Sequence, residues 1–322
     1  MNKFTTVTER ILSEDALKHI HKCETEGRRP TVESIAGVLQ VSLNEVADLL
    51  AKMTTHRLLR TDGDRFHLTT EGQEYALQVI RAHRLWERYL ADETGFPEDE
   101  WHDRADRQEH VLSVAETQAL SARLGNPILD PHGDPIPTAR GEFVPHGGQP
   151  LTKLAPGQAA RIVHMEDEPA VVYAQLVAEG LYPGVEVRLI ESTPQRIRFL
   201  AGGAERILAP ILANNVTVMP LPKEEVAEIA ASQNLAGLKI GETARVVSIS
   251  PACRGLERRR FMDLGILPGT IIKAEMISPS GDPTAYRIRG ALIGLRQEQA
   301  SLINITREFE LTPNQQYQLE VA

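Results

Sequence analysis

The chain has 322 residues, a net charge of −9 and only two cysteines; because these form no CxxC pair, a disulfide framework and a thiolate zinc site are excluded. The length exceeds what one hydrophobic core usually organises, so two or more domains are expected. Apolar runs stay shorter than the roughly 18 residues of a membrane helix, and the first residues lack the apolar core of a secretion signal, so the composition predicts a cytoplasmic protein without membrane insertion.

The first predicted domain, residues 1–70, combines three helices with a hairpin. Apolar residues recur at helical spacing from Ser13, the expected N-cap, to about residue 26. Two shorter helices are predicted over about 32–39 and 43–54, and the second is capped by Ser42. An Asp-Gly turn at 62–63 between two β-prone runs predicts a hairpin. This order is typical of a winged-helix DNA-binding domain. The alternative is a small helical domain that does not bind DNA.

The second predicted domain, residues 71–146, is strongly acidic. It carries seven Lys or Arg against fifteen Asp or Glu, while the rest of the chain is nearly balanced. It also holds half of the ten histidines: His83, His102, His110, His132 and His146. Carboxylates and imidazoles together are ligands that divalent transition metals prefer. The alternative is an acidic helix face that only contacts solvent.

Two long helices are predicted in this domain, from about Thr70 to Ala91 and from about Glu98 to Ser113. On the second helix one face carries His102, Asp106, Glu109 and His110. On the first helix, His83 and Glu87 share a face at i, i+4. We therefore expect two facing helices that close oxygen and nitrogen ligands around an ion.

Two other interpretations of these acidic helices remain open. Ion pairs with Arg88, Arg104 and Arg107 account for the acids, although these arginines fall on other faces of the helices. Acid/base catalysis by a carboxylate and a histidine is the other. No glycine-rich phosphate loop, nucleophile elbow or H-E-x-x-H motif accompanies them, so no enzyme is predicted.

The second half of the chain contains a repeat. Residues 125–150 are rich in Pro, Gly and Asp and are the expected linker. Beyond them, "LTKLAPGQAARIVHM" (151–165) is similar to "LAGLKIGETARVVSI" (235–249), and "EGLYPGVEVRLI" (179–190) to "LGILPGTIIKAE" (264–275). Two copies of one small β-barrel, closed or half-closed, are predicted at 150–221 and 235–322, joined by a helical connector within "LPKEEVAEIAASQN".

Several of these blocks resemble one known family. In order and spacing, "TVESIAGVLQVSLNEVADLLAKM", "HRLWERYL", "HDRADRQEHVLS" and "GNPILDPHGDPIP" are similar to the diphtheria toxin repressor family of metal-dependent transcriptional regulators, over roughly residues 10–140. The repeats resemble the FeoA type of small β-barrel, which this family usually carries once. The fold implied is α+β and multidomain: a winged helix, a helical metal-binding and dimerisation domain, and two FeoA-type β-barrels.

The resemblance implies two metal sites and an activating ion. One site uses Asp15 with Asp106, Glu109 and His110, and the other uses His83, Glu87 and His102. Iron-responsive members carry methionine and cysteine at the positions of Asp15 and Asp106, whereas manganese-responsive members carry carboxylates. This chain has aspartate at both, but Lys18 stands where manganese-type members have an acidic ligand. Mn²⁺ or Fe²⁺ is therefore expected, with harder oxygen ligands favouring Mn²⁺.

The resemblance also implies partners: a homodimer that binds a palindromic double-stranded DNA operator as a repressor of metal-uptake genes. The expected DNA contacts are Ser42, Asn44 and Glu45 at the start of the recognition helix, with Lys52 and Arg65 on the phosphate backbone. In the second repeat, "CRGLERRRFMDLG" is interpreted as a basic helix for protein contact or dimer stabilisation, or as a solvated surface. The alternative function is a FeoA-like binding adaptor of a ferrous iron transporter.

Overall fold

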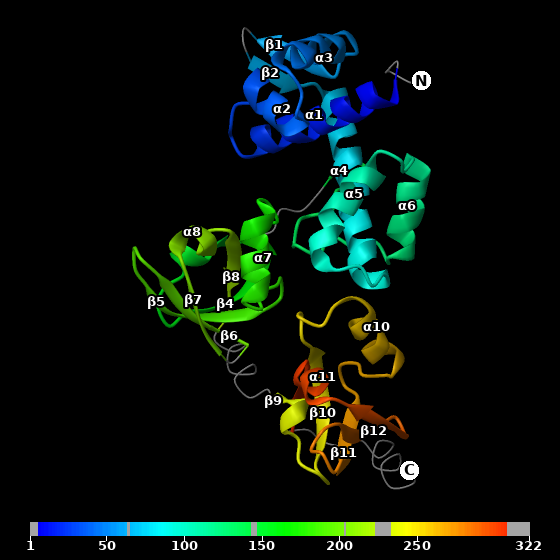
Figure 1. The fold of residues 1–322 in the computed structure, drawn as a ribbon, viewed down its shortest axis with the longest axis vertical. Coiled ribbons are helices and arrows are strands. Elements are labelled where there is room, and N and C mark those ends of the chain that lie inside the picture. The colour runs from blue at the N-terminus through cyan, green and yellow to red at the C-terminus, as the bar shows by residue number, and fades with distance from the viewer. Residues whose placement is uncertain (1–5, 63–64, 143–146, 203, 223–232, 308–322) are drawn as a thin grey trace. The chain divides into compact units, whose positions relative to one another are not determined.

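The structure is a computed structural model that describes residues 6–62, 65–142, 147–202, 204–222 and 233–307. The chain divides into two compact units, one made of Met1–Tyr89 and Phe96–Pro145, and the other of Leu90–Gly95 and His146–Ala322 (Figure 1). Each unit is described by itself. Gly63 of the expected hairpin turn and residues 223–232 of the expected helical connector lie outside the described residues.

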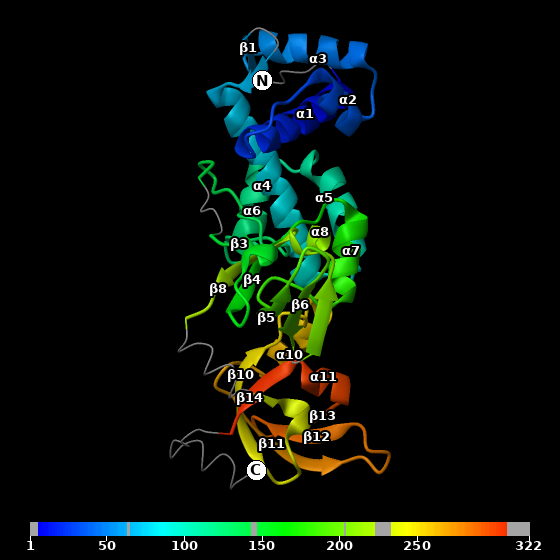
Figure 2. The same cartoon turned by 90° about the vertical axis from the view of Figure 1, so that its left-hand side faces the viewer.

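The first unit is helical apart from one short hairpin. Its elements are α1 (Val7–Thr25), α2 (Val32–Leu39), α3 (Leu43–Thr55), β1 (Leu59–Asp62), β2 (Arg65–Leu68), α4 (Thr70–Glu93), the 3-10 turn η1 (Glu98–Glu100), α5 (Trp101–Glu109) and α6 (Val114–Arg123). Figures 1 and 2 show α1 between the α2–α3 pair and the helices α4, α5 and α6. This helix therefore has neighbours on both of its sides.

Helix α1 begins earlier than the sequence pattern predicts. Its N-cap is Thr6, whose hydroxyl accepts a hydrogen bond from the backbone N–H of Glu9. Ser13, the expected cap, is buried inside the helix and donates to the carbonyl of Glu9 over 2.8 Å. The prediction was wrong because a serine in a helix interior satisfies its hydroxyl on the preceding turn, which the sequence does not distinguish from capping.

The helix-turn-helix and hairpin form as predicted. Gln40 ends α2 in the left-handed conformation, with φ of 54°, and Ser42 caps α3 through a capping box with Glu45. β1 and β2 pair antiparallel, from Leu59 opposite Leu68 to Asp62 opposite Arg65. Apolar faces of all these helices share one core, which includes the buried residues Leu17, Ile20, Ile35, Leu50, Met53 and Leu58.

The predicted helix 98–113 is shorter than expected, because only α5 (Trp101–Glu109) is α-helical within it and a separate helix, α6, begins at Val114. α5 ends at Glu109, and His110 is its C-cap. Ser113 then caps α6 in a capping box with Glu116, whose carboxylate accepts from the Ser113 N–H over 2.9 Å. The continuous pattern concealed this break because the polar cap residues fit the helical period of the acidic face.

The first part of the expected linker 125–150 is an ordered loop in the first unit. Arg84 donates to the carbonyl of Pro135 over 2.6 Å and to the carboxylate of Asp134 over 3.0 Å. Arg81 donates to the carbonyl of Pro137. A bridge between Leu129 and Pro135 closes the loop. The two arginine donors on α4, Arg81 and Arg84, therefore hold a segment whose composition suggested a linker.

The second unit contains two antiparallel sheets with the same strand order. The first copy comprises β3 (Gln149–Pro150), η2 (Leu151–Lys153), β4 (Ala159–Met165), α7 (Ala170–Ala178), β5 (Glu186–Ser192), β6 (Ile197–Ala201), β7 (Ala204–Leu208), α8 (Pro210–Ala213) and β8 (Val216–Pro220). The second comprises β9 (Gln233–Asn234), η3 (Leu235–Gly237), β10 (Thr243–Ile249), α10 (Gly255–Asp263), β11 (Ile271–Ile277), β12 (Thr284–Ile288), β13 (Ala291–Leu295), α11 (Gln297–Ser301) and β14 (Ile303–Thr306).

Corresponding strands occupy corresponding places in the two sheets. The orders are β3-β8-β4-β5-β6-β7 and β9-β14-β10-β11-β12-β13. Each sheet has its own hydrophobic core, centred on residues such as Phe199 and Leu176 in the first copy and Phe261 and Tyr286 in the second. The sequence repeat therefore corresponds to two copies of one topology.

Neither sheet is a closed barrel, so of the two predicted forms, closed and half-closed, the closed one is wrong. Within the described residues, β3 and β7 are the two outer strands of the first sheet, and β9 and β13 those of the second. β3 and β9 have only two residues each, too few to form a ladder that closes a sheet onto its opposite edge. Sequence periodicity predicts strands, but not which edges pair.

Among the described residues, no single helix is both long enough and apolar enough to cross a membrane. Helices α2 and α3, which meet at a bend of 105°, reach that length and apolar composition only when they are taken together.

Candidate metal centre

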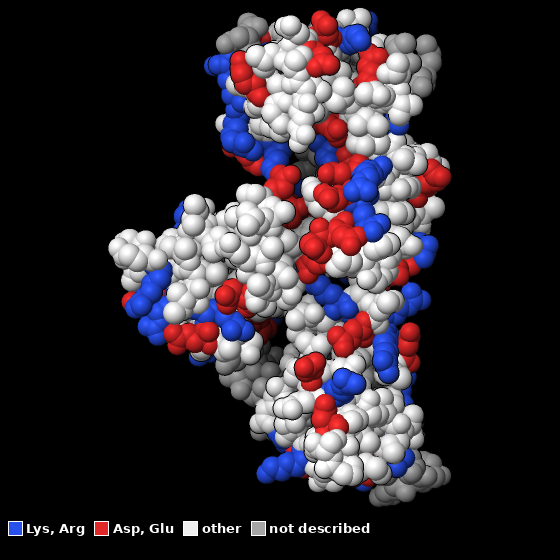
Figure 3. Space-filling view, in the orientation of Figure 1, with Lys and Arg blue, Asp and Glu red and all other residues white. Residues whose placement is uncertain are grey.

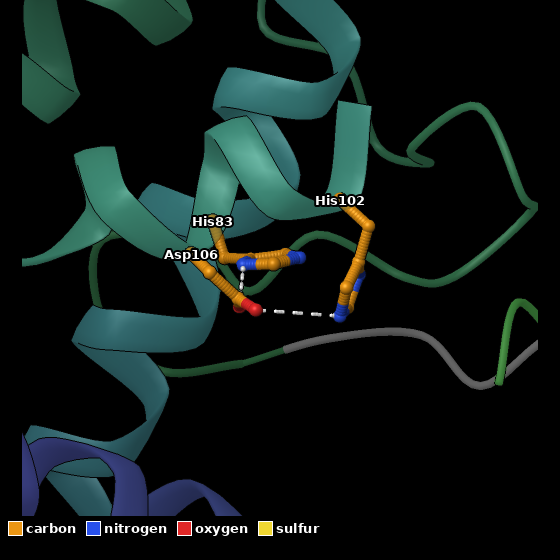
Figure 4. Close-up of side chains that lie close together, drawn as sticks. All are labelled: His83, His102 and Asp106. Atoms are coloured by element: carbon orange, nitrogen blue, oxygen red, sulfur yellow. Dashed lines mark ion pairs between the residues drawn. The ribbon is translucent and has the colours of Figure 1, made fainter. Parts of the chain in front are cut away.

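One group of ligand atoms comes from α4 and α5. His83, His102 and Asp106 each offer an atom within 4.8 Å of the others (Figure 4). Asp106 Oδ1 lies 3.3 Å from His83 Nδ1, and Asp106 Oδ2 lies 3.6 Å from His102 Nε2. The fold brings them together because His102 and Asp106 are one turn apart on α5, which faces α4.

Glu87 contributes a further carboxylate to this group. Its Oε1 lies 3.1 Å from His83 Nε2 and 3.3 Å from His102 Nδ1. The carboxylate is buried, and the structure also places an imidazole that the sequence analysis did not select beside it. His132 Nδ1, from the loop after α6, lies 3.6 Å from Glu87 Oε2. The acidic neighbour Asp130 is buried as well, and burial, followed by the nearby Asp134 carboxylate, raises its pKa to about 7.

The second group links the first helix of the chain to the end of α5. Asp15, Glu109 and His110 offer atoms within 4.8 Å of one another. His110 Nε2 lies 3.2 Å from Asp15 Oδ1 and 3.6 Å from Glu109 Oε1. Asp106 was expected in this group, but it lies with His83 and His102 instead. It stands one turn beyond His102, so the helix directs its carboxylate to that histidine.

Glu14 orients the imidazole of His110 and was missed by the sequence analysis. Its Oε2 lies 2.6 Å from His110 Nδ1, and its Oε1 accepts hydrogen bonds from Tyr75 at 2.5 Å and Arg10 at 2.9 Å. A carboxylate on one ring nitrogen fixes the ring and leaves the other nitrogen for a ligand bond. The only sequence signal was an acid adjacent to Asp15 inside a helix.

Glu109 connects the two groups. Its side chain is fully buried, and its Oε2 lies 2.6 Å from His83 Nδ1 while its Oε1 faces His110. Lys18 of α1 also donates to both Glu109 oxygens over 2.8 Å and to Asp106 Oδ1 over 3.3 Å. The centre is therefore a continuous set of acids and imidazoles with one ammonium inside it.

The surrounding surface is mixed rather than uniformly acidic. Figure 3 shows acidic and basic side chains next to one another over the helices of the first unit. A cavity of about 400 Å³ lies between α1, α4, α6 and the loop at 138–141, and Glu14 and Glu109 are among the residues that line it.

The acids and imidazoles shift one another's pKa values. Burial lowers the pKa of His83, but the carboxylate of Glu87 and hydrogen bonds to Asp106 and Glu109 raise it well above its usual value. Burial likewise opposes protonation of His110, and hydrogen bonds to Asp15 and Glu14 raise its pKa to about 9. These interactions favour the positively charged form of both imidazoles, with protons on both ring nitrogens, when no cation is bound.

We expect metal binding to release protons and to strengthen as the pH rises. A ligating imidazole must be neutral, so below a pKa of about 9 the metal has to displace the proton of His110. Raising the pH from about 6.5 towards 9 removes this competitor, and affinity should increase about tenfold per pH unit for each proton displaced. Calorimetric titration in buffers of different ionisation enthalpy counts the protons, and a pH-independent affinity would contradict the arrangement.

The chemistry of the donors fits a divalent transition metal. Carboxylate oxygens and imidazole nitrogens without thiolates suit Mn²⁺, Fe²⁺ or Zn²⁺. Each group offers three such atoms at mutual distances that one ion can span. The second group includes Asp15 from α1, so a cation bound there would connect α1 to the end of α5.

The residues expected to contact DNA are exposed, and some are engaged locally. Glu45 accepts from the N–H of Ser42 over 2.9 Å and from its hydroxyl over 2.7 Å, so these two residues cap α3. Lys52 pairs with Glu9 of α1 over 3.1 Å. Asn44 and Arg65 are exposed on α3 and β2. The capping role of Glu45 was not anticipated, although Ser-x-x-Glu is its sequence signal.

Comparison with known proteins identifies two domains and several relatives. Residues 69–138 match the iron dependent repressor metal binding and dimerisation domain, and residues 233–307 match the FeoA domain. Over 228 residues the chain is 31% identical to the iron-dependent repressor IdeR of Mycobacterium leprae. This alignment covers 65% of this chain and 95% of that protein. It is 33% identical to the diphtheria toxin repressor of Corynebacterium glutamicum over 214 residues, covering 63% and 93%.

Solved structures agree with these matches. A manganese-dependent transcriptional repressor in complex with manganese superposes with a TM-score of 0.60 at 26% identity, covering 65% of this chain and all of that one. IdeR of T. acidophilum gives a TM-score of 0.54 at 26% identity, covering 65% and 97%. The names of these relatives are those of repressors rather than enzymes. The matched sequence and fold together show that the chain belongs to the diphtheria toxin repressor family of metal-dependent transcriptional regulators.

Proposed function

We propose that this protein is a metal-activated, DNA-binding transcriptional repressor of metal-ion uptake and homeostasis genes. The observation that carries the proposal is the group Asp15, Glu109 and His110, because it draws ligands from both α1 and α5. Its relatives are named as iron-dependent and manganese-dependent repressors. We infer Mn²⁺ or Fe²⁺ as the activating ion, bound by Asp15, His83, Glu87, His102, Asp106, Glu109 and His110.

The proposed mechanism couples the metal groups to the angle of the winged helix. Asp15 lies on α1, which packs against α2 and α3, whereas Glu109 and His110 end α5. A bound divalent cation supplies positive charge that several carboxylates share. When these ligands converge, α1 is fixed relative to α5, and the DNA-competent orientation of α3 is selected from the available states. Without the cation, the acidic groups that no metal neutralises disfavour the approach of DNA phosphates.

The DNA complex is proposed to contain a homodimer on a palindromic operator. The matched domain is described as one for metal binding and dimerisation. Two-fold symmetry of a winged-helix dimer implies two equivalent half-sites. Val111 and Val114, at the turn between α5 and α6, are 69% and 67% exposed and are available for such an interface. A protein that acts on operator DNA belongs in the cytoplasm, and we infer no catalytic role for it.

The proposed DNA contacts are of two kinds, contacts to base edges and contacts to phosphates. Asn44, at the start of α3, is the proposed base reader, while Ser42 and Glu45 fix the N-terminus of α3 that approaches the groove. Lys52 and Arg65 are proposed to contact phosphates. The boundaries 1–70 for the winged helix and 71–146 for the metal-binding and dimerisation domain remain part of this proposal, as do 150–221 and 235–322 for the two copies.

Operator binding in the presence and absence of metal tests this function. We expect the full chain with Mn²⁺ or Fe²⁺ to bind a palindrome upstream of its own gene cluster about tenfold to a hundredfold more tightly than with a chelator. Affinity should also fall steeply as salt increases, because phosphate contacts release counterions. Fluorescence anisotropy across metal and salt concentrations measures both effects. Equal binding with and without metal would contradict the proposal.

The match of residues 233–307 to FeoA supports a second candidate, a binding adaptor of a ferrous iron transporter. We propose protein contact through the second copy, and α10 carries the basic residues that such a contact would use. Under this alternative, the chain does not bind duplex DNA with or without metal, and residues 233–307 bind a cytoplasmic domain of the transporter. The first copy shares its strand order and is proposed to be FeoA-like as well.

A further inference from the structure

Lys18 places a positive charge where the two ligand groups meet. Its Nζ lies 2.8 Å from both carboxylate oxygens of Glu109 and 3.3 Å from Asp106 Oδ1. These oxygens also face the two imidazoles, His83 at 2.6 Å and His110 at 3.6 Å. The ammonium therefore contacts the same oxygen atoms that an activating metal requires.

The position of Lys18 on α1 makes this contact a property of the fold. Lys18 follows Glu14 by four residues and Asp15 by three, so all three side chains leave α1 on the side that faces α5. The carboxylate that it contacts is 91 residues away in sequence and fully buried. An ammonium on a flexible stem can leave such a contact without a change in the backbone of the helix.

Burial and charge show what this lysine does for the metal-free protein. Glu109 has a fully buried side chain, and a buried carboxylate is strongly destabilising unless cations or donors compensate it. Lys18 supplies that compensation from α1, in parallel with the imidazole of His83 on α4. The ion pair thus links α1 to α5. A metal shared by Asp15 and Glu109 would link the same two helices.

We propose that Lys18 is a tethered counter-cation that competes with the activating metal for Glu109 and Asp106 and holds α1 against α5 while the metal is absent. This inference rests on the proposed metal-activated function. Lys18 thereby sets the metal concentration at which the repressor responds. A metal that takes these oxygens must displace the ammonium or share them with it, and either event lowers the metal affinity.

Substitution of Lys18 in the full-length chain tests the inference. Lys18→Met removes the charge and keeps the length of the stem, Lys18→Gln keeps a hydrogen-bond donor, and Lys18→Arg keeps the charge. Lys273→Met is the matched control, because Lys273 also pairs with a glutamate, Glu275, over 3.4 Å, but outside the ligand groups and the proposed DNA contacts. Two quantities are measured for each: the Kd for Mn²⁺ by calorimetric titration, and the thermal midpoint in a chelator.

The expected results separate competition from a purely structural role. Lys18→Met and Lys18→Gln should bind Mn²⁺ about tenfold or more tightly than the unsubstituted chain, and their metal-free midpoints should fall by a few degrees. Lys18→Arg should keep a Kd close to that of the unsubstituted chain, and Lys273→Met should leave the Kd unchanged. If Lys18→Met does not fold without metal, Lys18→Gln decides the question by the same measurements.

Two different outcomes would overturn the two proposals. If the unsubstituted chain binds Mn²⁺ and the neutral variants bind it equally or more weakly, Lys18 is no competitor and this inference fails alone. If the unsubstituted chain binds neither Mn²⁺ nor Fe²⁺ with measurable affinity, the proposed metal-activated function fails, and the inference fails with it.

Discussion

Glu109→Gln is expected to weaken Mn²⁺ or Fe²⁺ binding by about a hundredfold and to abolish metal-activated DNA binding. The carboxylate of Glu109 faces both imidazoles and the ammonium of Lys18, so its charge serves both ligand groups. The amide keeps the volume of the side chain but removes the negative charge, and it presents hydrogen atoms where an acceptor is required. Calorimetric titration measures the metal affinity, and anisotropy measures the DNA affinity.

A glutamate on the same acidic segment provides the control. Glu100 precedes α5, its side chain is 45% exposed, and it pairs with Arg104. Glu100→Gln makes the same chemical change outside the ligand groups and should leave both affinities within about twofold of the unsubstituted chain. If Glu109→Gln and Glu100→Gln behave alike, Glu109 does not bind the ion.

Asp15→Ala is expected to separate metal binding from DNA binding. His83, Glu87 and His102 retain their mutual geometry on α4 and α5, so one metal equivalent should still bind. The ligand that α1 supplies to this group is lost, although Glu14 still contacts His110, and metal should no longer increase DNA affinity, which removes a coupling of about 5- to 150-fold. Titration of metal and DNA in parallel measures the stoichiometry and the coupling.

Asp103→Ala is the matched control because Asp103 is exposed on the first turn of α5. It should keep both the metal stoichiometry and the increase in DNA affinity. Retention of full metal activation in Asp15→Ala would show that α1 is not coupled through this carboxylate, and the proposed mechanism would then be wrong.

Local patterns in the sequence predicted most of the helices of the first unit. The i, i+4 spacing of His83 with Glu87 and of His102 with Asp106 depends only on helical periodicity, and the structure brings these four side chains together. The cap at Ser42 and the turn at Gln40 are similarly local. These features could be predicted because each depends on residues within a few positions of one another.

Features that depend on distant residues could not be predicted in this way. Glu14 and Lys18 approach α5 only after α1 packs against it, and periodicity carries no information about that contact. His132 lies beside Glu87 because arginines on α4 hold the proline-rich loop, whose composition alone suggested a linker. The open edges of the two sheets could not be predicted for the same reason. Whether two outer strands pair depends on segments that are far apart along the chain.

The two sheets of the second unit each enclose a separate set of buried residues. A substitution on the surface of one copy therefore leaves the interior of the other intact. Because the two interiors are separate, residues on the surface of either copy can change without loss of packing in the other copy.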